Sequence, residues 1–432
     1  MALSLRSPVT AVRALLRDEL ARGAAVNLGF TAVNTLLALV GGVLLARYLG
    51  PAGIGIVSLG VLVLEFGSVL DNIPTGGFIR EYSQGATREK FATALALRIG
   101  LGLLTAALLA LSAPFLAPVL DIPVYLLLLL ALVPLTSVIS SMAIIVWEAR
   151  RNPWRRNLPG TSEAAVRVVL IVLALWGVAV VDDPILTAAA ITVLASLAGA
   201  LVGLPLLPGL STKGFEAERA RGYVRFGMTA QFTSVLNKVV FWIDILIIDL
   251  LMGHYTQGLY RTAYSVMAFV PLFVMSVGIF AGPSVSERHG ANDHRAIERL
   301  VSRSFFYGFA IAIPLVVGAL VFAEPVLGIF GPEFAEAAWV LRGLALVALL
   351  VTAIQPFEFA FPAVNRPGLA VRILLVEVIV NVALDLLLIP FYGVLGALIA
   401  TAAAYVCGLV VALLTYRQLG YALPRLSHLR AG

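Results

Sequence analysis

The stretch IVNVALDLLLIP, residues 379–390, places Asn381 and Asp385 in an apolar run long enough to lie inside a membrane. A carboxylate near the middle of a bilayer costs roughly 2.5–3.5 kcal/mol even on lenient insertion scales. Such residues therefore face a cavity, a partner or an ion rather than lipid. The composition and organisation of the whole chain decide among these.

Composition identifies the chain as a polytopic membrane protein. Hydrophobic residues make up 60% of the 432 positions and charged residues only 12%, a balance that water-soluble globular proteins do not show. The apolar runs repeatedly reach the roughly 20 residues that a membrane-spanning helix needs, without the alternation of barrel strands. We therefore predict an all-α protein with twelve transmembrane helices. They are expected at residues 26–47, 54–78, 91–111, 124–147, 161–181, 185–207, 223–251, 257–280, 305–322, 335–357, 370–389 and 394–416.

The placement of Lys and Arg predicts the topology. With both termini in the cytoplasm, the inner segments and their flanks carry 24 basic residues, whereas the outer loops carry only Arg47. The positive-inside rule therefore assigns the N-terminus and the C-terminus to the cytoplasm.

A charged segment, STKGFEAERARG at residues 211–222, divides the spans into two blocks of six. The stretch GPAGIGI at residues 50–56 recurs as GHYTQGL at 253–259, with both glycines displaced by 203 residues. Repeats of six spans share one orientation, so we expect a pseudo-twofold axis along the membrane normal and a cargo cavity between the halves. Chance recurrence of a short glycine loop is the alternative. The expected parts are a cytoplasmic N-terminal segment 1–25, a six-helix bundle 26–208, a cytoplasmic linker 209–222, a six-helix bundle 223–417 and a cytoplasmic tail 418–432.

The usual sequence signatures of enzymes are missing. The chain has no glycine-rich Lys-Ser/Thr phosphate loop, and its four histidines lack metal-ligand spacing, so no catalytic residue and no tightly bound cofactor is expected. The outer loops are short and offer Asp182 and Asp183 as the only adjacent acids, which are more typical of helix termini than of a metal site. These features argue against a glycosyltransferase.

The two polar residues of the 379–390 stretch belong to a predicted ion-coupling site. Asn381 and Asp385 are four residues apart and share a helix face, and the chain turns and re-enters to bring Ala397 and Thr401 to a comparable depth. Asp244 reaches the same level on the seventh span. Two carboxylates, an amide, a hydroxyl and a helix carbonyl suit Na⁺, or a carboxylate pair that accepts H⁺. In the alternative interpretation these residues only bond neighbouring helices together.

Basic residues also lie within the predicted spans: Arg98, Arg167, Lys238, Arg261 and Arg342. Lys238 is the deepest and should face water or an anion. One interpretation is a set of salt bridges with acids such as Glu65, Asp71 and Glu163. The other is a cationic cavity for a phosphate-bearing cargo. Glu65 and Asp71 are also alternative coupling acids, although their spacing of six puts them on different helix faces.

Four stretches carry a resemblance to a known family: ALVGGVLLARYLGPAGIGIVSLG (38–60), FIREYSQG (78–85), WIDILIIDLLMGHYTQGLYRTAYSV (242–266) and NVALDLLLIPFYGVLGALIAT (381–401). In this order they resemble the polysaccharide exporter and Wzx-like flippase branch of the multidrug/oligosaccharidyl-lipid/polysaccharide (MOP) superfamily, over essentially the whole chain. The resemblance implies a MATE-like fold and a flippase that moves a polyprenyl-linked oligosaccharide to the outer leaflet by alternating access.

The resemblance also implies roles for individual residues. The related lipid II flippases have a sodium site, whose ligands match Asp244, Asn381, Asp385, Thr401 and the backbone of Ala397. For phosphate contacts we expect Arg80, Lys238 and Arg261 first, and Arg98 and Arg167 second. The chain lacks the Arg-Asp pair of the lipid II branch in its first span and that branch's two extra C-terminal helices, which argues against a peptidoglycan precursor as cargo.

The expected setting is a prokaryotic cell membrane. The expected partners are a polyprenyl-linked glycan, membrane lipids and other glycan-assembly enzymes, with no nucleic acid, and the chain is expected to act as a monomer. Two alternatives stay open: a MATE-like cation-coupled multidrug exporter, which would favour an acidic cavity, and a membrane-embedded glycosyltransferase or ligase.

Overall fold

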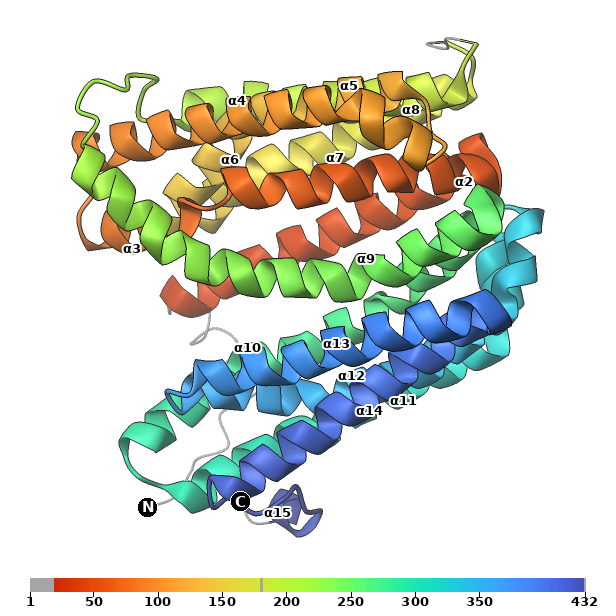
Figure 1. Ribbon diagram of the computed structural model, residues 1–432. Helices are drawn as coiled ribbons and strands as arrows, with labels where there is room; N and C mark the ends of the chain where they lie inside the picture. The colour runs from red at the N-terminus through yellow and green to blue at the C-terminus, as the bar shows by residue number, and fades with distance from the viewer. Residues whose placement is uncertain (1–18, 179–181, 431–432) are drawn as a thin grey trace, which may run out of the picture. The chain divides into compact units, whose positions relative to one another are not determined.

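The computed structural model describes residues 19–178 and 182–430, and these ranges are helical, with no strand among them (Figure 1). The all-α class is thereby confirmed. Three predictions fall partly outside the described residues: the N-terminal segment at 1–18, the end of the fifth span at 179–181 and the tail at 431–432.

The helices fall before and after the charged linker. Those before it are α2 (Glu19–Asp71), α3 (Thr75–Gln84), α4 (Arg88–Val119), α5 (Val124–Leu130), α6 (Val133–Ala149), α7 (Pro153–Leu175), α8 (Pro184–Gly203) and the short η1 (Leu204–Leu206). Those after it are α9 (Ala217–Met267), α10 (Phe269–Gly290), α11 (His294–Gly328), η2 (Pro332–Ala337), α12 (Ala338–Ala363), α13 (Pro367–Tyr392), α14 (Val394–Gln418) and α15 (Ser427–Arg430).

The helices form two compact units. The first contains the described residues up to Leu49 together with Leu59–Phe232, and the second contains Gly50–Ser58 together with the residues from Thr233 onward. In the second unit α13 packs along α14, and α12 contacts both of them. The bundle limits expected from the sequence, 26–208 and 223–417, follow the membrane crossings and stay a prediction.

The chain is a multi-pass membrane protein. Within the described ranges, nine segments are long and apolar enough to cross a membrane. One of these is α2, which is two helices joined at Gly50 (φ 65°, ψ 179°), so it supplies two crossings. α9 is not among the nine, and it also consists of two helices, joined at Gly253 (φ 80°, ψ 170°). Counting both arms of α2 and both arms of α9, the second of which leads into α10, gives the twelve predicted crossings.

The two glycine stretches noticed in the sequence pack against each other reciprocally. A Cβ on Gly55 would lie 2.2 Å from the His254 carbonyl oxygen, and a Cβ on Gly258 would lie 1.9 Å from the Pro51 carbonyl oxygen. Pro51 and His254 are 203 residues apart, and so are Gly55 and Gly258. The two contacts are therefore equivalent under the repeat. Next to them, Gln257 donates a hydrogen bond of 2.6 Å to the Ser58 hydroxyl. Because the matching glycines share both a backbone conformation and a packing role, the repeat is structural.

Prolines interrupt two of the predicted spans. α5 ends at Leu130, four residues before Pro134, and α9 ends at Met267, four residues before Pro271. Proline has no N–H and its ring crowds the carbonyl four residues earlier, so each helix ends where that clash would begin. The span predicted at 54–78 is likewise divided, by a turn between α2 and α3. In contrast, Pro314 and Pro356 stay inside α11 and α12.

Asp183 starts α8, in line with the helix-terminus interpretation of the adjacent acids. Its carboxylate accepts hydrogen bonds from the backbone N–H groups of Ile185 (2.8 Å) and Leu186 (3.2 Å) and from the Tyr125 hydroxyl. These bonds, that of Tyr125 above all, hold the pKa of Asp183 below its usual value. The cap is therefore in place at neutral pH and weakens only as the pH falls through that lowered pKa.

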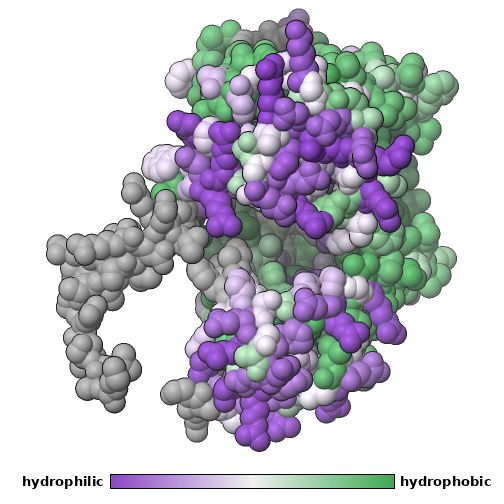
Figure 2. Space-filling view, turned by 90° about the vertical axis from the view of Figure 1, so that its left-hand side faces the viewer, coloured by the Kyte–Doolittle hydropathy of each residue, from purple (hydrophilic) through white to green (hydrophobic). Residues whose placement is uncertain are grey.

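The surface of each unit has a hydrophilic end and hydrophobic flanks. In each unit taken by itself, hydrophilic residues gather at one end (Figure 2): at the α3–α4 connection in the first unit and at the α10–α11 connection in the second. The flanks expose large apolar side chains such as Leu111 (70% exposed), Phe115 (76%) and Phe391 (78%). Only lipid makes such exposure favourable, so the flanks are the surfaces that contact the hydrocarbon.

Candidate functional site

Asp244 is the centre of a buried polar cluster in the second unit. It lies on the first arm of α9 and is 1% exposed. Its Oδ2 accepts hydrogen bonds from the Thr401 hydroxyl of α14 (2.9 Å) and from the Tyr260 hydroxyl of the second α9 arm (2.8 Å). Thr401 is also within 2.8 Å of the Ala397 carbonyl oxygen. The structure thus brings together three of the predicted ligands, Asp244, Ala397 and Thr401, and adds Tyr260.

α13 contributes the other two predicted ligands. Asn381 is 1% exposed and Asp385 0% exposed, and the Asp385 carboxyl lies close enough to Asp244 for the two to interact electrostatically. Both polar atoms of Asn381, both oxygens of Asp385 and Oδ1 of Asp244 are buried without a hydrogen-bond partner. Buried oxygens without partners are costly, so these oxygens are candidates to ligate a cation or to bind protons.

The donor set fits a small hard cation. Carboxylate, amide, hydroxyl and carbonyl oxygens are the ligands that Na⁺ and similar ions prefer, and one Na⁺ or one H⁺ offsets the repulsion of two adjacent carboxylates. Within the described residues, no group of three or more His, Cys, Asp and Glu side chains is arranged to hold a metal. The mixed oxygen donors make the cluster a candidate site for a light ion.

Two members of this polar region escaped sequence reasoning. Glu377 lies four residues before Asn381 on the same face of α13, is 2% exposed and has an unpartnered Oε1. A Cβ on Gly408 of α14 would lie 2.3 Å from that oxygen, so the glycine makes room for the carboxyl. The spacing of four could have revealed Glu377. Tyr260 lacked any local signal, because its partner Asp244 is 16 residues away.

Arg98 belongs to a structural network in the first unit. It is 2% exposed, and its Nη1 donates to the Asp71 carbonyl oxygen (3.1 Å), the Asn72 Oδ1 (3.3 Å) and the Thr75 hydroxyl (2.8 Å). These acceptors form the turn between α2 and α3. Arg98 therefore donates hydrogen bonds to backbone and side-chain acceptors that have no partner within α2 at the end of that helix. Of the alternative coupling acids, Asp71 is buried beside Arg98 and Glu65 is half-buried in the same unit.

This network predicts that Arg98→Met destabilises the protein by about 3 kcal/mol or more, because buried acceptors lose a charged donor. Thermal unfolding of the purified protein in nanodiscs measures the effect. The matched control is Arg167→Met, which removes only a partly exposed pair with Glu163 one helical turn away (2.9 Å) and should cost about 0.5 kcal/mol or less. An Arg98→Met protein as stable as the wild type, but inactive, would instead assign Arg98 to the cargo.

The remaining predicted cationic residues are more accessible. Arg80 is exposed on α3, with its guanidinium 5.4 Å from the centre of the Phe226 ring. Lys238 is half-buried on the first arm of α9. Arg261, half-buried on the second arm, lies over the rings of Phe241 (5.0 Å) and Trp242 (4.8 Å). α9 thus carries half-buried cations as well as the fully buried Asp244.

The helical fold described above is similar to those of solved membrane transporters. An inward-facing MATE multidrug transporter of the MOP superfamily aligns with a TM-score of 0.76, at 13% identity, over 91% of this chain and 98% of that chain. The lipid II flippase MurJ aligns with a TM-score of 0.72, at 16% identity, over 93% of this chain and 89% of that one. The chain has the MOP-superfamily fold.

The chain belongs to the polysaccharide biosynthesis protein family, whose model matches residues 44–338. Two curated relatives come from Haloferax volcanii. The probable low-salt glycan biosynthesis flippase Agl15 is 31% identical over 202 residues, which are 46% of this chain and 43% of Agl15. The probable flippase AglR is 25% identical over 189 residues, or 43% of this chain and 40% of AglR. The matches thus span less than half the length of either relative.

Proposed function

We propose that the protein is a flippase for a polyprenyl-phosphate- or polyprenyl-diphosphate-linked oligosaccharide. It moves the glycan headgroup from the cytoplasmic to the outer leaflet by alternating access and is a transporter rather than an enzyme. The family match and the flippase names of both relatives support this. A phosphate headgroup cannot cross hydrocarbon unaided, so its path must offer charged donors in place of water.

The observation that carries the proposal is the separation of charges along α9. Asp244 is 1% exposed, whereas Lys238 and Arg261 are only half-buried. Cations within reach of a ligand suit a phosphate, whereas the sequestered carboxyl suits a small ion. This arrangement disfavours an organic cation as cargo and a multidrug exporter as the function.

The same separation supports ion coupling. We infer that Asp244, Asn381, Asp385, Thr401 and the Ala397 carbonyl hold one Na⁺ or H⁺ at a time, because their unpartnered oxygens need a positive charge. Binding and release of that charge would favour different conformations of the second unit and so drive the transport cycle. The expected partners are the lipid-linked glycan and the enzymes that assemble it, and the protein is expected to work as a monomer.

A reconstitution experiment tests the function. Purified wild-type protein in liposomes is expected to move a fluorescent polyprenyl-diphosphate oligosaccharide from one leaflet to the other, and Lys238→Ala is expected to slow this about tenfold or more through loss of a phosphate contact. Lys213→Ala, which removes an exposed lysine of the linker, is the charge-matched control and should flip the glycan at the wild-type rate. Efflux of organic cations without glycan flipping would replace the proposal with the multidrug alternative.

A further inference from the structure

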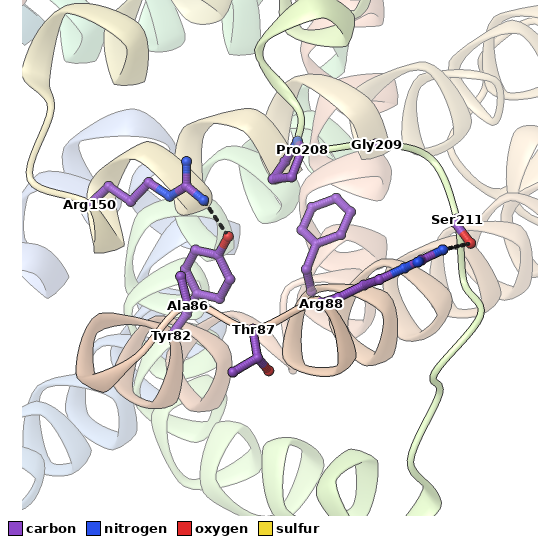
Figure 3. Close-up of a pocket in the computed structure, with 9 residues that line it drawn as sticks. Tyr82, Ala86, Thr87, Arg88, Arg150, Pro208, Gly209 and Ser211 are labelled. Carbon is purple, nitrogen blue, oxygen red and sulfur yellow. Dashed lines mark hydrogen bonds between the residues drawn. The ribbon is translucent and has the colours of Figure 1, made fainter.

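A basic pocket lies at the hydrophilic end of the first unit, and none of the residues that line it is a predicted cargo contact. It has a volume of about 420 Å³ and is formed by the end of α3, the start of α4, the end of α6 and the segment that follows η1 (Figure 3). The ring of Tyr82 lies between Arg150 on one side and Arg88 and Ser211 on the other, and Phe91 also lines the pocket. Positive-inside topology places this end at the cytoplasmic surface of the membrane.

Both arginines are held in place by neutral groups. Arg150 donates to the Tyr82 hydroxyl (2.9 Å), and its guanidinium lies over the rings of Tyr82 (5.5 Å) and Trp147 (5.1 Å). Arg88 donates to the Ser211 hydroxyl (3.4 Å). A guanidinium has five N–H donors, so each arginine retains donors for an anion. These contacts orient both guanidinium groups without neutralising their positive charge.

Nearby acids do not cancel this charge. None of the nine residues that line the pocket is Asp or Glu. Of the neighbouring acids, Glu89 follows Arg88 in the chain and interacts with it electrostatically, but it is exposed and does not line the pocket. Glu81 pairs with Arg219 (3.3 Å) and Glu148 pairs with Arg156 (3.3 Å), and neither pair includes a pocket residue. In the part of the chain that the structure describes, Arg88 and Arg150 form no ion pair with an acid. The residues that line the pocket therefore carry a net positive charge.

The start of α4 adds to this charge. Thr87, Arg88 and Phe91 line the pocket, and α4 runs for 32 residues from Arg88, so the positive end of a long helix dipole lies at the pocket wall. Trp147 and the arginines stacked on it, Arg150 and Arg155 (4.4 Å), form the aromatic and basic belt typical of the headgroup level of a membrane. These features fit an anion of the size of a lipid headgroup at this level of the membrane.

We propose that the pocket binds the phosphate headgroup of a lipid in the cytoplasmic leaflet. Arg88 and Arg150 donate to the phosphate oxygens from opposite sides, while Tyr82 and Phe91 pack against the apolar part of the headgroup. Basic pockets at helix ends on the cytoplasmic side are suited to anionic headgroups. The lining includes none of the predicted cargo residues, and the proposal does not depend on transport activity.

Lipid retention by the full-length protein tests the site. The protein is purified from vesicles of phosphatidylcholine with phosphatidylglycerol, and bound phosphatidylglycerol is measured by native mass spectrometry. The double variant Arg88→Gln/Arg150→Gln is expected to retain about tenfold less of this lipid than the wild type, since two basic contacts are lost. The control Arg151→Gln/Arg221→Gln removes the same charge from exposed positions that do not line the pocket and should retain the lipid as the wild type does.

Two further measurements distinguish a lipid phosphate from free phosphate and control for misfolding of the variants. Millimolar inorganic phosphate should not displace the lipid, and displacement would assign the pocket to free phosphate instead. Arg150→Lys keeps the charge but removes the forked donor, so intermediate retention by a normally folded protein supports a phosphate contact. Equal retention by wild type and by the Gln double variant would overturn the proposal. Glycan flipping is not measured here, so failure of the site and failure of the transport proposal give different results.

Discussion

Asp385→Ala and Asp385→Asn are expected to reach the membrane in normal amounts and to reduce glycan export strongly. Asp385 is fully buried, both its oxygens lack a partner, and it faces Asp244. Its removal leaves a single carboxyl to hold the coupling ion. The coupling free energy between two sites is typically about 1–3 kcal/mol, so the transport rate should fall by about 5- to 150-fold. The Asn variant should transport no better than the Ala variant, because an amide cannot carry the negative charge.

Surface glycan in a strain that lacks the chromosomal gene, scored with glycan flipping in liposomes, measures this effect. Asp182→Asn is the matched control, because it makes the same change at an exposed position and should export normally. A variant lacking Asp385 that flips glycan at the wild-type rate, and still responds to an imposed ion gradient, would show that the coupling charge is carried elsewhere. Glu377 would then be the next residue to substitute.

Gly258→Ala is expected to destabilise the fold strongly. Its Cβ would lie 1.9 Å from the Pro51 carbonyl oxygen and 2.8 Å from the Pro51 carbonyl carbon, and these are backbone atoms that no rotamer change can move. The two glycine segments must separate to admit the methyl group. Overpacking of this kind costs typically about 1–3 kcal/mol, and we expect the upper end because the Gln257–Ser58 hydrogen bond lies beside the contact.

Thermal unfolding and flipping rate together check this prediction. Gly318→Ala is the control: it lies inside α11, and a Cβ at this position would have nothing within 4 Å, so the substitution should be neutral or stabilising by up to about 1 kcal/mol. Gly55→Ala should reproduce the effect of Gly258→Ala, because its Cβ would meet the His254 carbonyl oxygen at 2.2 Å. Wild-type stability and flipping in both glycine variants would contradict the close approach.

The fold was largely predictable because its determinants are local. Apolar length predicts crossings, and the lipid environment leaves helices as the structure for apolar runs of this kind. The helix breaks were harder to predict, because the sequence does not distinguish Pro314 and Pro356, which stay inside helices, from Pro134 and Pro271, which follow a break. Whether a proline ends a helix or is absorbed depends on packing around the freed carbonyl, which the neighbouring residues do not reveal.

The candidate site was predictable to the extent that helix periodicity governs it. The spacing of four linked Asn381 with Asp385 and Ala397 with Thr401, and the common depth linked both pairs with Asp244. Tyr260 required knowledge of how the second α9 arm packs on the first. The basic pocket required three connections to meet at one helix end, and no single stretch of sequence carries that information.

The glycine contact described above is self-complementary: residue 51 meets 258, and residue 55 meets 254, each pair exchanged by the same displacement of 203. An interface of that kind is isologous, as in twofold homodimers. A shorter ancestor carrying one six-helix block could therefore have used this patch to bind its own copy. Gene fusion would then have turned a concentration-dependent association into a permanent one.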